Sequence, residues 1–199
     1  MALLFRWLKV AGELTSKSVA GGAIVGLSAC GASSPAPEGR CDTVTRETPE
    51  IQPGTHVPAG TPIEWNTNPP SSGPHFGAWA RWGESYVEPV LDRGYWVHNL
   101  EHGGVVVALK CDALCGELVD RVKALDPRLP VEPICEGVSA RRWLIVRDPL
   151  LPEEVQVAAV AWGVTSTARC LDEDSLTEFV SARLGSGPEK TCAQGSAPE

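Results

Sequence analysis

The sequence has very little of several features on which common protein functions depend. Methionine occurs once, as Met1, which would be lost on processing, so a Cu(I) site built from thioether ligands is excluded. Lysine and arginine together number 17 against 25 aspartate and glutamate residues, which gives a formal net charge of −8 at pH 7. Because phosphate binding depends on clustered Lys and Arg and no basic run occurs, no nucleic-acid partner is expected.

Signatures of several enzyme classes are absent as well. The sequence contains no serine-nucleophile elbow, no phosphate-binding loop and no dinucleotide fingerprint. Its acidic residues are scattered and no pair stands out by spacing, so a mechanism based on paired carboxylates has no support. The sequence therefore gives no direct assignment to these enzyme classes.

The apolar run at residues 19–29 is too short to cross a bilayer as a helix, and it has the length of the apolar part of a secretory signal. Basic residues precede it, and it ends in Leu-Ser-Ala-Cys30, which resembles the bacterial lipobox. There, small residues precede the cleaved bond and the cysteine sulfur carries the lipid. We expect residues 1–29 to be a lipoprotein signal peptide and the lipid on Cys30 to anchor the mature chain to a membrane. An ordinary signal peptide, or a buried apolar segment with a chance cysteine, is the alternative.

The composition after Cys30 indicates one folded domain with loose ends. Residues 30–50 are small, polar and proline-bearing, so they cannot bury enough apolar surface to order themselves and we interpret them as a spacer. Residues 186–199 have the same character and are expected to be a flexible tail. Residues 51–185 have the length of a single globular domain. We expect this domain in the cell envelope, outside the cytoplasm.

Six cysteines besides Cys30 indicate disulfides in an exported domain, and six cysteines allow fifteen connectivities. A bridge between Cys41 and Cys192 would join the two arms that flank the domain. The pair Cys111 and Cys115 lies between an expected strand and an expected helix, which also allows a thiol-redox role. A structural disulfide is the simpler interpretation. The six candidates are Cys41, Cys111, Cys115, Cys135, Cys170 and Cys192.

The pattern of apolar residues predicts a mixed α+β fold. Residues 51–97 are rich in Pro, Gly and aromatic residues, so they should form loops that wrap the rest of the domain. The later residues are regular, and Asp172 or Asp174 is a possible cap for the last helix. We expect a small β-sheet with two helices on one face. The expected elements are strands at 104–109, 142–147 and 155–164, and helices at 115–125 and 175–184.

All four histidines lie between residues 56 and 102, and imidazole is the commonest transition-metal ligand. His98 and His102 would share a face on a helix but would lie about 13 Å apart on a strand. We interpret His75, His98 and His102 as ligands, with His56 or Glu101 as a fourth ligand or a supporting partner. Such a set suits Zn(II) or Cu(II) and, less well, Fe(II). Histidines that are merely hydrogen-bonded to backbone among the tryptophans are the alternative.

The segment from His98 to His102 also has the literal pattern His-x-x-Glu-His of the inverted zinc peptidases, in which Glu101 would be the general base. Those enzymes carry the motif inside a long helix. Here Gly103 and Gly104 follow at once and end any helix, so this interpretation is unfavourable.

Three segments together are similar to a known family. They are Gly-Thr-His56-Val-Pro, Asn-Pro-Pro-Ser-Ser-Gly-Pro-His75, and His98-Asn-Leu-Glu-His102-Gly-Gly. Over about residues 52–189 the chain resembles the bacterial domain-of-unknown-function family 3105. The resemblance implies an exported or membrane-anchored protein and a site at the histidines and Glu101, but it implies no activity. A non-catalytic binding or structural module of the envelope therefore remains an alternative to a metal-binding domain.

Overall fold

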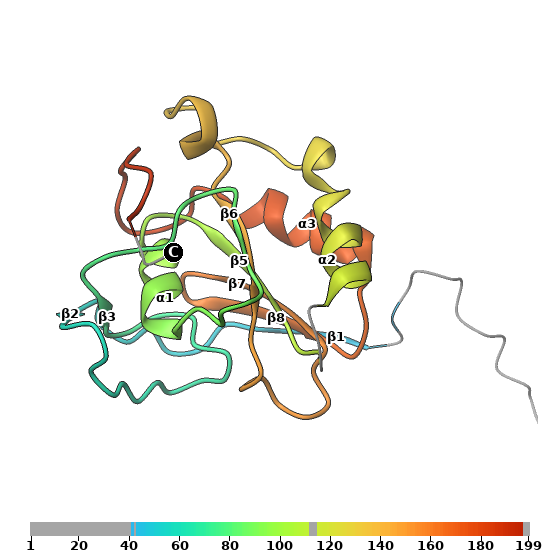
Figure 1. Ribbon diagram of the computed structural model, residues 1–199, viewed down its shortest axis with the longest axis horizontal. Coiled ribbons are helices and arrows are strands. Elements are labelled where there is room, and N and C mark those ends of the chain that lie inside the picture. Colours follow the sequence, from blue (N-terminus) through green and yellow to red (C-terminus); the bar gives the residue numbers. More distant parts are fainter. Residues whose placement is uncertain (1–40, 42, 112–114, 197–199) are drawn as a thin grey trace, which may run out of the picture. The chain divides into compact units, whose positions relative to one another are not determined.

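The computed structural model describes residue 41, residues 43–111 and residues 115–196 (Figure 1). The expected signal peptide and Cys30 lie outside these residues. Among the described residues, none of the helices combines the length and the apolar character that a membrane span requires.

A six-stranded mixed sheet with the order β1-β8-β7-β5-β6-β4 forms the centre of the domain (Figure 1). The parallel pairs are β5 with β6 and β4 with β6, and the other neighbours are antiparallel. Both faces of β5 are covered, which explains its uninterrupted apolar sequence. The strands are β1 (Val44–Glu47), β4 (Ser85–Tyr86), β5 (Val105–Leu109), β6 (Trp143–Arg147), β7 (Val157–Ala161) and β8 (Val164–Ala168).

The apolar run predicted as one strand at 155–164 contains β7 and the first residue of β8. Trp162 and Gly163 form the turn between them, and Gly163 has a φ of +70°, a conformation that glycine adopts without strain. The two other predicted strands are confirmed as β5 and β6.

Two helices cover one face of the sheet, as predicted, which confirms the α+β fold. They are α2 (Gly116–Lys123) and α3 (Glu173–Arg183). Val122 and Phe179 pack with Val107 and other residues of that face. Asp172 caps α3, because its carboxylate accepts a hydrogen bond of 2.9 Å from the Ser175 amide.

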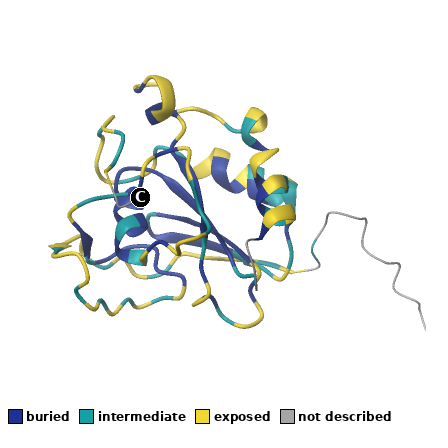
Figure 2. Ribbon diagram, in the orientation of Figure 1, coloured by how far each residue is buried: buried dark blue, intermediate teal, exposed yellow. Residues whose placement is uncertain are grey.

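The part of the Pro-, Gly- and aromatic-rich region that precedes residue 93, which we call the aromatic segment, covers the opposite face together with a further helix, α1 (Arg93–Glu101). Trp82, Trp96 and Leu100 pack there against Val106 and Val160. The central strands of the sheet are thus buried between two layers, whereas the edge strand β1 is largely exposed (Figure 2). Two short strands, β2 (His56–Val57) and β3 (His75–Phe76), pair in parallel, and β3 packs against α1.

Three disulfides join the described cysteines, and the bridge expected between Cys41 and Cys192 is wrong. Cys41 pairs with Cys170, because β1 runs antiparallel to β8 and brings the segment before β1 to the end of β8. Cys192 pairs with Cys135. Cys111 pairs with Cys115. Three disulfides indicate an oxidising compartment outside the cytoplasm.

Both ends of the domain have ordered contacts. β1 lies within the range expected as a spacer, and it forms an edge of the sheet. We call residues 185–196 the C-terminal strap; residues 186–196 of it lie in the range expected as a tail. The strap is hydrogen-bonded to residues of the aromatic segment and to the end of α1.

Candidate metal centre

Helix α1 carries two of the residues predicted for the site, and a third follows directly after its last residue. Asp92 caps its start by accepting a hydrogen bond of 2.8 Å from the Gly94 amide. Packing also fixes the helix, because a Cβ atom at Gly94 would overlap the Phe76 ring. His98 and Glu101, three residues apart, lie on neighbouring positions of one helix face. His102 is the residue at which the helix ends, and its backbone is no longer helical.

The two glycines after His102 turn the chain from α1 into β5. Gly103 has a φ of +80°, and its amide donates to the Leu100 carbonyl at 3.0 Å. The Gly104 amide donates to the Asn99 carbonyl at 2.8 Å. A glycine is needed at Gly103 for this conformation, so the helix ends where the sequence predicted.

His56 and His75 reach the same place from β2 and β3. The two residues are direct neighbours in the register of the parallel pair. The His75 amide donates to the Thr55 carbonyl at 3.0 Å, which ties the two strands together. Because β3 packs against α1, residues far apart in the sequence meet the helix face that carries His98 and Glu101.

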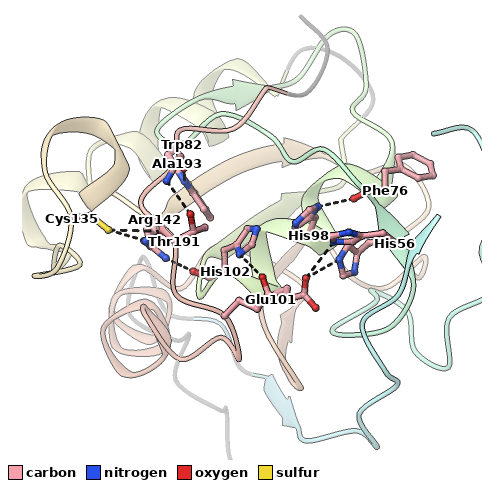
Figure 3. A network of polar contacts seen from close by, with 12 residues as sticks. His56, Phe76, Trp82, His98, Glu101, His102, Cys135, Arg142, Thr191 and Ala193 are labelled. Atoms are coloured by element: carbon pink, nitrogen blue, oxygen red, sulfur yellow. Dashed lines mark hydrogen bonds and ion pairs between the residues drawn. The ribbon is translucent and has the colours of Figure 1, made fainter. Parts of the chain in front are cut away.

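Three imidazoles and one carboxylate converge in this place (Figure 3). One ligand atom each from His56, His75, His98 and Glu101 can be chosen so that all lie within 4.8 Å of one another. Glu101 Oε2 lies 3.0 Å from His75 Nε2 and 3.7 Å from His56 Nε2. Ligand atoms of a tetrahedral Zn(II) site with bonds of about 2.0–2.1 Å lie about 3.3 Å apart. The four residues therefore fit one ion after small side-chain movements.

Backbone carbonyls orient two of the rings. His98 Nδ1 lies 2.6 Å from the Phe76 carbonyl oxygen, and His75 Nδ1 lies 2.9 Å from that of Gly73. A ring that donates its Nδ1–H to a carbonyl has its lone pair on Nε2. Metal-binding histidines in proteins commonly have such a partner.

The contact between His75 and Glu101 is the feature that most needs a cation. His75 is fully buried, and its Nε2 makes no hydrogen bond although the Glu101 carboxylate lies 3.0 Å away. A neutral His75 that donates through Nδ1 directs an Nε2 lone pair at this carboxylate. Two facing acceptors repel each other unless a cation or a proton lies between them. A bound ion would satisfy both groups.

Burial keeps two of the rings neutral. Burial is the largest cause that lowers the pKa of His98 to about 3; the hydrogen bond to the Phe76 carbonyl opposes it, and the neighbouring histidine rings contribute to the lowering. Burial is also the largest cause that lowers the pKa of His102 to about 4. Metal ligands must be deprotonated, so His98 is ready to bind a cation at neutral pH.

His102 lies beside the converging group and is not part of it. Its ring is centred 4.6 Å from the His98 ring and 4.6 Å from the Trp79 ring. Its Nδ1 lies 3.5 Å from Glu189 Oε2, and neither ring nitrogen has a hydrogen-bond partner among the described residues. Of the three expected ligands, the structure thus brings together His75 and His98 but not His102. Both candidates for the fourth ligand, His56 and Glu101, join them. The inverted-peptidase pattern does not form, because its second histidine is outside the group and its glutamate is inside.

The group is open to solvent on one side. The His56 side chain is 55% exposed, whereas those of His75 and Glu101 are 0% and 9% exposed. Gly54 allows the chain to pass close to the site, because a Cβ atom there would overlap the Glu101 carboxylate. An ion can therefore enter past His56.

The sequence does not predict a role for Arg142. The one indication of it is the position of a charged residue directly before an apolar strand, β6. It is fully buried, and its guanidinium donates to the backbone carbonyls of His102 and Thr191. It also lies over the Trp82 ring, 5.7 Å from the ring centroid. Arg142 thereby joins the end of α1 to the C-terminal strap.

The cysteine pair considered for thiol chemistry lies elsewhere. Cys115 precedes α2 and packs in the core between α2, α3 and the sheet. The histidine group lies on the α1 side of the sheet, so the Cys111–Cys115 disulfide is not part of it.

Comparison with known proteins gave one match. A family model described as "Protein of unknown function (DUF3105)" matches residues 56–196, which is more than half of the chain. No curated protein and no solved structure matches the chain.

Proposed function

The chain belongs to this family of unknown function. We propose that it is an extracytoplasmic lipoprotein that binds one transition-metal ion. The ligands are His56, His75, His98 and Glu101. The observation that carries the proposal is the buried contact between His75 Nε2 and the Glu101 carboxylate, two acceptors that a cation would hold together. Three imidazoles and one carboxylate around it form a ligand set that proteins use for such ions.

The ligand set limits the identity of the ion. Three neutral imidazoles and one carboxylate suit Zn(II) or Cu(II), and Fe(II) less well. Four protein ligands complete a tetrahedral Zn(II) shell, whereas Cu(II) and Fe(II) accept further ligands such as water. The exposed side of the site, at His56, leaves room for one such further ligand.

Metal analysis of the exported chain tests the proposal. The protein, purified without a metal-affinity tag, is expected to contain about one zinc or copper ion per chain by elemental mass spectrometry. Stripping with a chelator should lower the unfolding temperature, and returning the ion should restore it, because an ion that binds only the folded state stabilises it. Should the folded chain contain no metal and take up neither zinc, copper nor iron, the proposal is wrong. The protein would then be better described as a binding or structural module of the envelope.

The lipid anchor at Cys30 is a separate part of the proposal. The lipobox-like sequence and the three disulfides both support an exported chain, and the two acyl chains of a diacylated cysteine are sufficient to anchor a protein to a membrane. We expect the wild type to incorporate labelled palmitate and to fractionate with membranes. Cys30→Ala should do neither, and the matched variant Cys41→Ala should still do both. Unchanged labelling of Cys30→Ala would refute the anchor.

A further inference from the structure

The C-terminal strap contacts the backbone of a proposed metal ligand. The Glu189 amide donates to the Glu101 carbonyl at 3.0 Å, and the Gly185 amide donates to the Gly103 carbonyl at 2.8 Å. These bonds satisfy carbonyls at the end of α1 that have no partner within the helix. The strap therefore helps to set where α1 ends and where Glu101 points.

The strap also holds an aromatic ring that packs on the site. The Ser196 amide donates to the Trp79 carbonyl at 3.0 Å, and Gln194 exchanges backbone and side-chain hydrogen bonds of 3.2 Å with Trp82. The Trp79 ring is centred 4.9 Å from the His98 ring. Movement of the strap would thus loosen the packing of a second proposed ligand.

Two further contacts hold the strap in place, beside the backbone hydrogen bonds above. One is covalent, the Cys135–Cys192 disulfide. The other is Arg142, which donates to Thr191 in the strap and to His102 at the end of α1. Cys135 is buried, whereas Cys192 is exposed and accessible to another protein.

We propose that the C-terminal strap positions the ligands of the metal site and that the Cys135–Cys192 disulfide makes metal affinity depend on thiol redox state. The inference rests on the proposed metal site. A dithiol reductant in the same compartment attacks Cys192 Sγ, which breaks the disulfide and releases Cys135 as a thiolate. The second thiol of the reductant then displaces Cys192. The reductant becomes a disulfide. Its two electrons and two protons pass to Cys135 and Cys192, which both end as thiols.

A pair of double variants tests the coupling in the full exported chain, with Zn(II) affinity measured by competition with a chromophoric chelator. Cys135→Ser/Cys192→Ser is expected to bind Zn(II) roughly ten- to hundredfold more weakly than the wild type, the usual effect of losing groups that orient metal ligands. The matched control is Cys41→Ser/Cys170→Ser. That bridge lies beside α3, on the other face of the sheet, and Cys170 lines a small hollow there with Leu176.

The control separates positioning from stability. The Cys41–Cys170 bridge spans 129 residues and the Cys135–Cys192 bridge spans 57, so loss of the former should destabilise the chain at least as much. If metal affinity simply followed the stability of the fold, the control variant would lose at least as much Zn(II) affinity as Cys135→Ser/Cys192→Ser. We expect the control to keep the wild-type affinity.

A second variant displaces the strap without touching a cysteine. A Cβ atom at Gly187 would overlap the backbone of Gly103 and the Glu101 carbonyl, so Gly187→Ala should lift the strap and weaken Zn(II) binding about tenfold. Gly116→Ala, where a Cβ atom meets nothing within 4 Å, is its control. If Cys135→Ser/Cys192→Ser does not fold, the comparison of Gly187→Ala with Gly116→Ala tests whether the strap positions the metal ligands.

The outcomes distinguish the two proposals. Wild-type affinity in both strap variants would overturn the coupling and leave the metal site intact. Equal losses in strap variants and controls would also overturn it, because affinity would then follow overall stability. A wild type that binds no Zn(II), Cu(II) or Fe(II) would refute the metal site itself.

Discussion

The His98→Ala variant is expected to contain no bound ion when purified, whereas His102→Ala is expected to keep the ion. His98 directs Nε2 into the converging group while its Nδ1 is held by the Phe76 carbonyl. His102 is buried on the same helix end but lies outside the group. Loss of one of four ligands should reduce metal content from about one ion per chain to background, measured by elemental mass spectrometry.

The two variants control for each other. Each removes one buried imidazole, His98 within α1 and His102 directly after it, and leaves a cavity of similar size, so their losses of stability should be comparable. Near-ultraviolet circular dichroism would confirm that both fold. Equal metal loss in the two variants would show that His102 belongs to the site, and retention in both would remove His98 from it.

Glu101→Gln should change stability in opposite directions with and without metal. In the metal-free protein, the new amide can donate a hydrogen bond to His75 Nε2 where two acceptors now face each other at 3.0 Å. The variant should therefore gain about 1 kcal/mol in the free energy of unfolding. With metal present it should be the less stable protein, because losing a charged ligand weakens binding by at least about 100-fold.

Chemical denaturation with chelator and with Zn(II) measures both effects. Glu189→Gln is the control, because this carboxylate also lies near a histidine, 3.5 Å from His102 Nδ1, but its side chain is 57% exposed. It should change the free energy of unfolding by less than about 0.5 kcal/mol in either condition. If Glu101→Gln destabilises the metal-free protein, His75 and Glu101 share a proton, and the main support for the metal site is lost.

Local patterns in the sequence were sufficient to predict the central strands β5, β6 and β7 and the two-helix layer. β5 and β6 are continuous apolar runs because both of their faces are covered, and α3 begins at a residue that caps its amides. Such signals depend on neighbours in the chain, so they can be read without the fold.

Other elements gave no readable pattern. Helix α1 has most of its residues buried, including polar ones, so it shows no apolar stripe and its sequence left helix and strand equally open. β1 is half charged residues, and β8 consists mostly of Thr and Ser. They are strands because each has a partner in the sheet, which only the fold supplies.

The sequence by itself determined which residues can form a site. Four histidines and Glu101 lie in one third of the chain, within segments that place the protein in its family, and no histidine occurs elsewhere. It also determined that paired cysteines were to be expected, since six cysteines remain besides Cys30. These conclusions need only residue types and order.

Only the tertiary structure decided which of these residues meet. His56 and His75 join His98 and Glu101 because β2 and β3 pack against α1, while His102 lies past the end of the helix and meets the strap instead. Cys41 pairs with Cys170 because β1 lies beside β8. Contacts between distant segments depend on how whole elements pack, and apolar periodicity indicates the buried face of an element but not the element that packs against it.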